Sequence, residues 1–171
     1  MTPTIPTSRL VLRHLLKSSP TQVRWLRDPT VVRYSEQRHR NHTFSSQHNY
    51  VASFVGRSYI WGIFIVATNE HIGNLSARHD EANNVSEVGI LLGVPEHWHK
   101  GYGGEAWRAA CGWLLDKDAG NVRKLEAGCA RNNEAMLKII QHSDFKQEGE
   151  RLNHFLFNGN PVGAVLFGRM R

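Results

Sequence analysis

The run Lys100-Gly101-Tyr102-Gly103-Gly104 carries the residues best suited to chemistry, because three of its five residues are glycines. Without Cβ atoms, such a loop can bring several backbone N–H groups close to one ligand. A helical pattern starts directly after it, and a helix N-terminus adds partial positive charge. The arrangement favours a phosphate or pyrophosphate bound by the amides of residues 101–105. The plainer alternative is a tight turn whose glycines serve geometry only.

Spacing excludes two common phosphate loops. Gly104 follows Gly103 directly, so the glycines do not match G-x-G-x-x-G. The pattern G-x-x-x-x-G-K-[ST] occurs nowhere in the chain, so a Walker loop is also excluded.

A strand and a helix must position this loop. Val88, Ile90 and Leu92 alternate with other residues at the period of two expected of a strand. Gly93 and Pro95 then break that pattern. After the loop, apolar residues recur at helical spacing and would form one stripe, made of Ala106, Ala109, Ala110, Trp113 and Leu114. The sequence therefore predicts a strand, a glycine-rich turn and a helix.

The remaining patterns predict one mixed α/β domain with an antiparallel-rich sheet, and the chain shows no internal repeat. Further strands are predicted over residues 8–15, 59–67, 72–78, 123–130, 146–157 and 162–170. Further helices are predicted over residues 20–26, 28–33 and 49–55, the first capped by Ser18 or Ser19 and the third by Ser45 or Ser46. Residues 158–161 should form the turn between the last two strands, and a short helix should follow Asn133.

The run from His97 to Ala106, HWHKGYGGEA, resembles the coenzyme-A loop of the GNAT acetyltransferase superfamily, closest to the branch of ribosomal-protein N-terminal acetyltransferases. Gly101 and Gly103 satisfy the glycine part of the family signature. Trp98 takes its Gln or Arg place, and His99 replaces a usual glycine. The resemblance extends over nearly the whole chain. It implies that residues 1–171 form a single GNAT-like N-acetyltransferase domain, with a mostly antiparallel central sheet flanked by helices.

The same resemblance implies acetyl-CoA as the cosubstrate. In the family, the sheet splays at the strand before the loop, and the pantetheine lies there. Backbone N–H groups of residues 90–93 would polarise the thioester carbonyl, and those hydrogen bonds strengthen as negative charge develops on its oxygen. The residues expected to contact the cosubstrate are Ile90, Leu91, Leu92, His99, Lys100, Gly101, Tyr102, Gly103, Gly104, Glu105 and Asn133.

Glu87, near the start of the central strand, aligns with an acidic residue frequent in this branch. An amine that attacks a thioester must first lose its proton, and a carboxylate can accept that proton directly or through water. The resemblance thus makes Glu87 the candidate general base. The alternative is a strand-edge carboxylate paired with an Arg or Lys.

The group that assists the departing thiolate is less defined by the sequence. Many family members carry a Tyr there, and the matching place in this chain holds Ile140. Thiols have a pKa of about 8.5, so a thiolate leaves tolerably well without strong acid help. Asn133 or Ser143 would donate a hydrogen bond to the sulfur or the pantetheine. Asn133 also suits the cap of the following helix, and a Ser at a helix end often serves as a cap or a solvent contact.

The segment 35–43 is polar and aperiodic, and in the family it borders the acceptor pocket. Its Arg38, Arg40 and His42 are the candidate substrate contacts, because they can meet phosphate or carboxylate groups of an acceptor. A solvated loop is the alternative. The expected acceptor is a primary amine: a protein N-terminus, an amino sugar or another small amine.

Composition narrows the class of protein. The chain has 171 residues, 40% of them apolar, which suffices for one domain with a substantial core. No apolar run approaches the roughly 18 to 20 residues of a membrane span, so no membrane partner is expected. Arg9, Arg13 and His14 interrupt the apolar run near the N-terminus, which argues against a secretory signal. The formal net charge of +6 suits nucleic acid, an acidic protein or a phosphorylated small molecule. No nucleic-acid-binding motif accompanies the charge, so nucleic acid is not an expected partner.

The two cysteines read as reduced, buried thiols of a cytoplasmic protein. A metal site is not expected, because His39 and His42 lack convincing partner ligands. The protein is expected to be a monomer or a homodimer. A different class of function remains open, namely a non-catalytic GNAT-like module that binds coenzyme A as a sensor or interaction domain.

Overall fold

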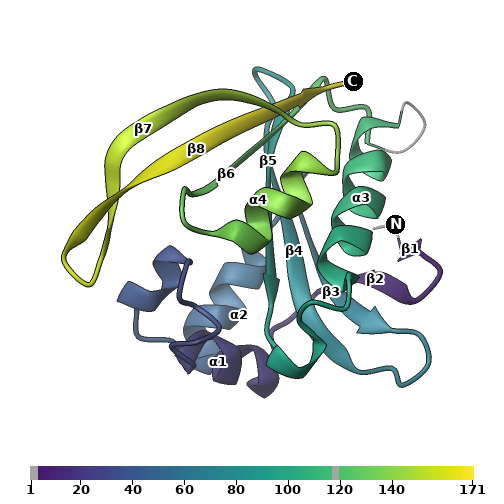
Figure 1. Ribbon diagram of the computed structural model, residues 1–171. Coiled ribbons are helices and arrows are strands. Elements are labelled where there is room, and N and C mark those ends of the chain that lie inside the picture. The colour runs from purple at the N-terminus through teal and green to yellow at the C-terminus, as the bar shows by residue number, and fades with distance from the viewer. Residues whose placement is uncertain (1–3, 117–119) are drawn as a thin grey trace.

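The computed structural model describes residues 4–116 and 120–171, and Figure 1 shows their arrangement. One eight-stranded sheet crosses the molecule in the order β1-β2-β3-β4-β5-β6-β8-β7. The strands are β1 (Ile5–Pro6), β2 (Leu10–His14), β3 (Tyr59–Ile65), β4 (His71–Asp80), β5 (Val85–Leu92), β6 (Lys124–Ala130), β7 (Lys146–Phe157) and β8 (Asn160–Met170). The α-helices are α1 (Pro20–Arg27), α2 (Phe44–Ala52), α3 (Tyr102–Leu115) and α4 (Glu134–Gln141), joined by the short 3-10 helices η1 (Glu36–His39) and η2 (Pro95–His97).

Neighbouring strands are antiparallel throughout this sheet except at one junction, where β5 and β6 run parallel. Helix α3 supplies the crossover that a parallel pair requires. The predicted fold class, a mixed and mostly antiparallel sheet flanked by helices, is confirmed.

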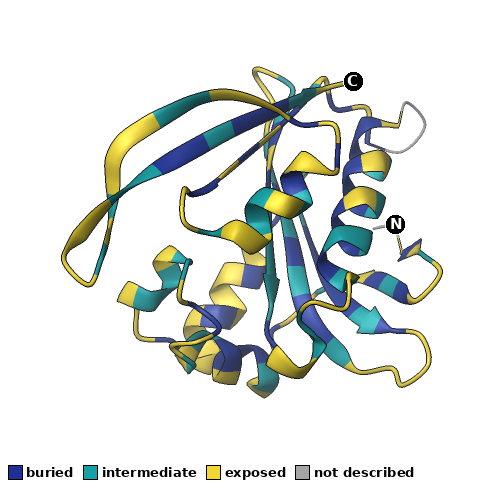
Figure 2. Cartoon of the chain, in the orientation of Figure 1, coloured by how far each residue is buried: buried dark blue, intermediate teal, exposed yellow. Residues whose placement is uncertain are grey.

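The main core lies between α3 and one face of the sheet. Every second residue of the central strands points to this face, so Trp61, Leu75 and Val88 pack against the α3 residues Ala106 and Trp107. Figure 2 shows this buried band along the central strands and the inner side of α3. Each large apolar side chain buried in this way contributes roughly 1.5–3 kcal/mol. Helix α2 covers the opposite face, where Val51 and Phe54 pack against Ile60.

Two helix predictions need correction. Residues 28–33 form turns and no helix, and Val31 and Val32 are buried there. Helix α2 begins at Phe44, well before residue 49, because Thr43 and Ser46 form a reciprocal capping box. Helix α1 follows the prediction closely. Ser19 caps it, Gln22 completes a capping box, and Pro20 occupies the first turn.

Strands β7 and β8 form a long hairpin that arches away from the body of the molecule (Figure 1). Its turn contains Asn158 and Gly159 at φ 52° and 79°, the two positive values of a two-residue type I′ turn. Pro161, predicted as part of the turn, instead lies within β8 opposite Leu156. The tip of this hairpin reaches the connection between α1 and α2, where Arg38 donates a hydrogen bond to the carbonyl of Leu156 at 3.4 Å.

Candidate active site

The parallel strands β5 and β6 pair over three residues only and then separate. The register ends at Glu87 opposite Glu126. Beyond that point β5 continues to Leu92 along β4, and β6 continues to Ala130 along β8. Figure 1 shows the two strands diverging, with α4 following the far end of β6. The sheet therefore has a wedge-shaped opening, narrow at Glu87 and wide toward Leu92 and Ala130.

The backbone of β5 presents alternate residues to this opening. Gly93 donates its N–H to Ile72 at 2.8 Å, toward β4, whereas the carbonyl of Asn84 accepts from Arg123 at 3.1 Å, on the β6 side. Trp98 donates its indole N–H to the carbonyl of Leu92 at 3.0 Å. Because peptide groups alternate between the two edges of a strand, the amides of Val88, Ile90 and Leu92 face the opening. The amide of Leu91 faces β4, where Asn74 is its register partner.

The N-terminus of α3 offers four amides without an intrahelical partner. Gly101 is the N-cap residue, at φ 82°, and no side chain caps the helix. Glu105 donates its N–H to the carbonyl of Gly101 at 3.1 Å, so the first helical hydrogen bond begins there. The unpaired amides are consequently those of Gly101, Tyr102, Gly103 and Gly104. The amide of Glu105, which the sequence placed in this set, is already engaged.

Exposed polar residues lead into this helix end. His99 lies at φ 60° and Lys100 is exposed. The two left-handed residues, His99 and Gly101, turn the chain sharply before α3. The loop thus combines free amides, the positive end of a helix and a lysine, which together fit a phosphate group.

The side chain of Glu105 ties the N-terminal segment to this loop. Its carboxylate accepts hydrogen bonds from Thr7 Oγ1 at 2.6 Å, Arg9 N at 2.9 Å and Arg9 Nε at 2.7 Å. Arg9 also donates to the carbonyl of Lys100 at 3.0 Å and lies over the ring of Tyr102. Partial burial alone would raise the pKa of Glu105, but the hydrogen bonds from Thr7 and Arg9 and the Arg9 charge lower it to about 2. This Arg9–Glu105 clamp holds the loop in place.

Replacing Glu105 with glutamine should destabilise the protein at neutral pH by about 1–2 kcal/mol, the modest figure reflecting the half-exposed Arg9. A carboxyl whose folded pKa is lowered contributes stability above its unfolded value, near 4.5, and loses it as the pH falls toward 2. The difference between wild type and Glu105→Gln should therefore shrink between pH 5 and pH 3 in urea denaturation. Glu96→Gln, in an exposed 3-10 turn nearby, is the control. A difference that does not change with pH would contradict the clamp.

Glu87 stands at the narrow end of the opening, on the sheet face opposite α3. It is exposed, and its carboxylate makes no hydrogen bond or ion pair with any described residue. Its register partners are Arg78 and Glu126. Arg78 is held elsewhere, with its guanidinium bonded to Ser53 and 3.5 Å from the centroid of the Phe54 ring. The alternative considered from the sequence, in which Glu87 is paired with an Arg or Lys, is therefore not what the structure shows.

A groove of about 630 Å³ surrounds Glu87. Lys124, the first residue of β6, forms salt bridges with Glu126 at 2.9 Å and Glu148 at 2.8 Å. Its charge is therefore already paired and is not fixed to Glu87. The groove is lined by Arg78, His79, Asp80, Asn83, Val85, Glu87, Arg123, Lys124, Glu126, Glu148 and Met170. Glu87 is therefore a carboxylate with open access and no counter-charge fixed to it.

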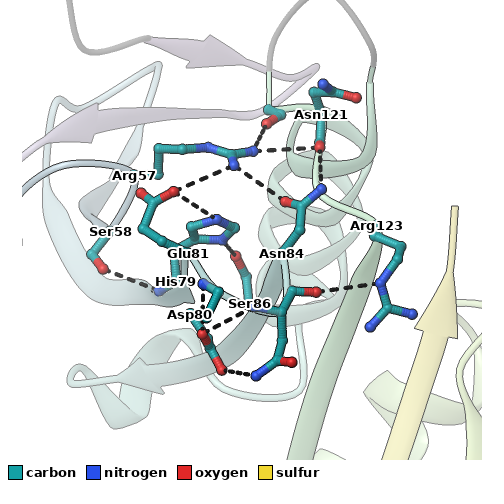
Figure 3. A network of polar contacts seen from close by, with 12 residues as sticks. Arg57, Ser58, His79, Asp80, Glu81, Asn84, Ser86, Asn121 and Arg123 are labelled. Atoms are coloured by element: carbon teal, nitrogen blue, oxygen red, sulfur yellow. Dashed lines mark hydrogen bonds and ion pairs between the residues drawn. The ribbon is translucent and has the colours of Figure 1, made fainter.

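A polar network around the buried side chains of His79 and Ser86 supports one wall of this groove (Figure 3). The His79 side chain is fully buried, and its Nδ1 lies 2.9 Å from Ser86 Oγ. Its Nε2 has no hydrogen-bond partner within the described residues, and Glu81 Oε2 lies 3.5 Å away. Burial, and secondarily the charge of Arg57, lower the pKa of His79. Burial likewise lowers the pKa of His71, whose ring stacks on Phe64.

The lowered pKa values of His71 and His79 predict that the protein loses stability in mild acid. The unfolded chain takes up protons near the ordinary histidine pKa of 6.5, whereas the folded chain resists until the pH is lower. The free energy of unfolding should therefore fall as the pH drops from 7.5 to 5.5 in urea titrations. His79→Gln should flatten that dependence, and His48→Gln, on the exposed side of α2, should leave it unchanged. Equal slopes for wild type and His79→Gln would contradict this account.

The predicted acceptor residues gather at a second cavity, at the wide end of the opening. The cavity holds about 570 Å³. It is lined by Leu26, Arg27, Pro29, Val32, Arg33, Arg38, His39, Arg40, Asn41, His42, Asn132, Leu156, Phe157 and Asn158. Asn132 lies two residues beyond the end of β6 at Ala130. On the other side, α1 packs under the end of β5, because a Cβ on Gly93 would lie 1.9 Å from the Trp25 indole. We call this cavity the arginine pocket.

His42 needs correction as a substrate contact. Its side chain is buried, with Nε2 2.9 Å from the carbonyl of Gln37 and Nδ1 3.0 Å from Gln47 Nε2. Both ring nitrogens are engaged, so His42 anchors the loop to α2. Arg38 is half-buried and pairs with Glu36 at 2.8 Å, while Arg40 is exposed and without a side-chain partner among the described residues. The alternative interpretation of this segment, a solvated loop, therefore holds only in part, because His42 and Arg38 are packed and hydrogen-bonded.

The acetyltransferase (GNAT) domain model matches residues 9–146. The chain belongs to the GNAT acetyltransferase family. Among curated proteins, no sequence matches it significantly.

Solved structures of GNAT acetyltransferases share the fold. RimL, the ribosomal L7/L12 alpha-N-protein acetyltransferase in complex with coenzyme A, is 17% identical with a TM-score of 0.81, and the match covers 98% of both chains. The ribosomal-protein-S5-alanine acetyltransferase of Vibrio fischeri is 18% identical with a TM-score of 0.78, over 98% of this chain and 96% of that one. MccE, the microcin C7 self-immunity acetyltransferase in complex with acetyl-CoA and AMP, is 15% identical with a TM-score of 0.78, over 96% and 94%.

In this GNAT chain, Asn133 is the cap of α4. Its side chain accepts from the N–H of Met136 at 3.2 Å, and its own N–H donates to Ala130 at 2.9 Å. It is half-buried and follows the wide end of β6, across the opening from Leu92. The capping role expected from the sequence is confirmed, and a contact with a cofactor remains compatible with it.

Ser143 needs correction as a catalytic candidate. Its hydroxyl accepts from the Trp107 indole at 3.1 Å and lies 2.8 Å from the carbonyl of Ile140, to which it donates. The residue is buried between α3 and α4, and Ile140 is fully buried beside it. A buried hydroxyl with these partners, and with the carbonyl of Ile139 at 2.9 Å, serves helix packing.

The cysteines and the histidines of this GNAT domain form no metal centre within residues 4–116 and 120–171. Cys111 and Cys129 are free and buried, and burial raises their pKa values to about 12 and about 11. Neither is a ready nucleophile, since the thiolate is the reactive form. In the same residues, no helix is long and apolar enough to cross a membrane.

Proposed function

We propose that the protein is an acetyl-CoA-dependent N-acetyltransferase that moves an acetyl group to a primary amine. One observation carries this proposal: the opening between β5 and β6 leads from Glu87 past the amides of Ile90 and Leu92 to the free N-terminus of α3. The two GNAT structures named above with coenzyme A or acetyl-CoA support the same ligand. We extend the proposal to residues 1–171 as one domain of this type.

Four amides would hold the pyrophosphate, those of Gly101 to Gly104. They fit it because they have no intrahelical partner, and because Glu105, the acidic residue of the first turn, is neutralised by Arg9. Lys100 and His99 lie beside them on exposed positions. The pantetheine would run along β5, where the amides of Val88, Ile90 and Leu92 can donate to it. The bound cosubstrate supplies an acetyl thioester, an acyl group already activated for transfer to an amine.

Glu87 would accept the proton of the attacking amine, directly or through water. It is exposed, has no ion-pair partner among the residues that the structure describes, and lies where β5 leaves β6. The amides of Val88 and Ile90 follow on the same strand and would stabilise negative charge on the carbonyl oxygen. When the C–N bond has formed and the C–S bond breaks, the sulfur leaves as thiolate. Asn133 stays our candidate for a hydrogen bond to it, because no hydroxyl takes the place held by Ile140.

The acceptor belongs to one of three classes: a protein N-terminus, an amino sugar or another small amine. The ribosomal-protein substrates for which RimL and the S5-alanine enzyme are named favour a protein or peptide, and the AMP in the MccE structure favours a nucleotide-sized molecule. The two buried free thiols agree with a reducing, cytoplasmic setting.

A second candidate function is a GNAT-like module that binds coenzyme A without catalysis. The apolar Ile140 at the usual Tyr position favours it, because the departing thiolate then lacks an acid. The open carboxylate of Glu87 argues for catalysis. The deciding difference is turnover.

The test is a thiol-release assay with acetyl-CoA and a panel of N-terminal peptides, amino sugars and small amines, with mass spectrometry of the amine. Thiol release that depends on an amine, with an acetyl group added to it, supports the transferase. Tight acetyl-CoA binding by calorimetry without acetylation of any panel member supports the binding module. Absence of acetyl-CoA binding overturns both.

A further inference from the structure

The arginine pocket is unusual in its charge. Four of its lining residues are arginines, and its wall contains no Asp or Glu among the described residues. Between residues 27 and 42 the chain has four arginines and two acidic residues, Asp28 and Glu36. Asp28 accepts a hydrogen bond from the N–H of Thr30, and Glu36 pairs with Arg38. The positive charge of this wall is therefore only partly neutralised.

Arg38 is the structural member of the group. It pairs with Glu36 at 2.8 Å, donates to Ser35 at 3.0 Å and lies over the ring of Phe157. Its contact with Leu156 joins the loop to the hairpin tip. Arg38 thus links the two walls of the pocket and has little capacity left for a ligand.

The other three guanidinium groups keep donors available. Arg27 is exposed, and toward the described part of the chain it commits only its Nε, which donates to the carbonyl of His42 at 2.8 Å. Arg33 is exposed and rests on the ring of Tyr34. Arg40 is exposed, and its guanidinium makes no hydrogen bond, ion pair or ring contact with a described residue. Each guanidinium offers paired N–H groups that match the oxygens of a phosphate.

We propose that the arginine pocket binds the phosphate group of a small phosphorylated amine, the acceptor of the acetyl group. This inference rests on the proposed function. A phosphate monoester carries close to two negative charges near pH 7 and offers three acceptor oxygens, which suit Arg27, Arg33 and Arg40. A volume of about 570 Å³ exceeds what an isolated anion fills and lies in the range of small-molecule sites. The pocket opens at the wide end of the strand opening, so an amine joined to the phosphate can extend toward β5.

Matched acceptor pairs test this: ethanolamine against phosphoethanolamine, and glucosamine against glucosamine 6-phosphate. The phosphorylated members should have at least tenfold lower KM. Arg40→Gln and Arg33→Gln should each raise that KM several-fold, and together at least tenfold, with the KM for acetyl-CoA nearly unchanged. Arg24→Gln, exposed on α1 and outside the pocket, is the control. A similar preference for acidic over neutral peptides, with no preference for phosphate on small amines, would overturn the small-molecule assignment.

A binding titration separates this inference from the proposed function. Phosphoethanolamine and glucosamine 6-phosphate are titrated by calorimetry into the protein saturated with coenzyme A, and into the Arg33→Gln, Arg40→Gln double variant. Binding by wild type alone supports the pocket. Equal use of both members of each pair, with no effect of the arginines, overturns the inference and leaves the transferase intact. Binding that depends on the arginines without acetylation of any amine overturns the proposed function and the acceptor role, and leaves an anion site.

Discussion

Glu87→Gln is expected to lower kcat at least tenfold while acetyl-CoA affinity stays nearly unchanged. An amine with a pKa of about 8 or above is largely protonated near neutrality and cannot attack until it loses a proton. General-base assistance is typically worth about a hundredfold to ten-thousandfold. The expected loss is set lower, at about tenfold or more, because water can partly replace the missing base. Glutamine keeps the size and hydrogen bonding of the side chain but removes the base. Steady-state kinetics with the best amine of the panel, together with calorimetry of acetyl-CoA, measure both quantities.

The pH dependence distinguishes a base from a structural carboxylate. The loss in Glu87→Gln should shrink from pH 6 to pH 9, because free amine becomes available without help. Glu126→Gln is the matched control, since Glu126 is the register partner on β6 and lines the same groove but is held by Lys124. It should keep kcat within about threefold of wild type. Wild-type kcat for Glu87→Gln across this range would leave Glu87 without a catalytic role.

The central strand and the turn of the last hairpin were predictable because their signals are local. Val88, Ile90 and Leu92 alternate within one strand, and the two positive φ values at Asn158 and Gly159 follow from the residue types of a two-residue turn. Helix α2 was predicted too late because Ser45, Ser46 and Thr43 all suit a cap. The reciprocal bonds between Thr43 and Ser46 decide between them.

The candidate site was predictable only where one segment makes it. The amides of Gly101 to Gly104 belong to a single turn, whereas the partner of Glu105 lies 96 residues away at Arg9. The partner of Ser143, Trp107, is 36 residues distant. Burial of a polar residue depends on such partners, and no periodicity reports them.

The arginine pocket was missed as a whole for the same reason. Arg38 and Leu156, which join its walls, are 118 residues apart. Arg27 and Arg33 lie beside or within helices predicted from the sequence, outside the polar segment that contains Arg40. Nothing in the sequence therefore indicated that they would share a pocket with Arg40. The basic content of segment 35–43 did indicate where an acceptor wall would lie.

Gly104→Asp is expected to weaken acetyl-CoA binding at least tenfold without weakening the fold. Gly104 is the third residue of α3, and an added Cβ would approach only the flexible end of Arg108, at 3.2 Å. An acidic residue in the first turn of a helix is favourable by about 0.3–1 kcal/mol, so the free energy of unfolding should hold or rise. A pyrophosphate on the same amides would instead meet a like charge. At about 6 Å and an effective dielectric constant of about 20–40, that repulsion is roughly 1.4–2.8 kcal/mol, a tenfold to hundredfold loss.

The neutral variant Gly104→Asn isolates the charge, because it has nearly the same shape. It should bind acetyl-CoA within about threefold of wild type, and the gap between the two variants should narrow as salt is raised. Arg108 would partly neutralise the new carboxylate and so weaken its repulsion of the pyrophosphate. The expected loss of affinity is therefore placed at the tenfold end of the range. Calorimetry measures the affinity and urea denaturation the stability. Stability and affinity should thus move in opposite directions, which no general damage to α3 can produce. Unchanged affinity in a folded Gly104→Asp protein would remove the α3 N-terminus as the phosphate site.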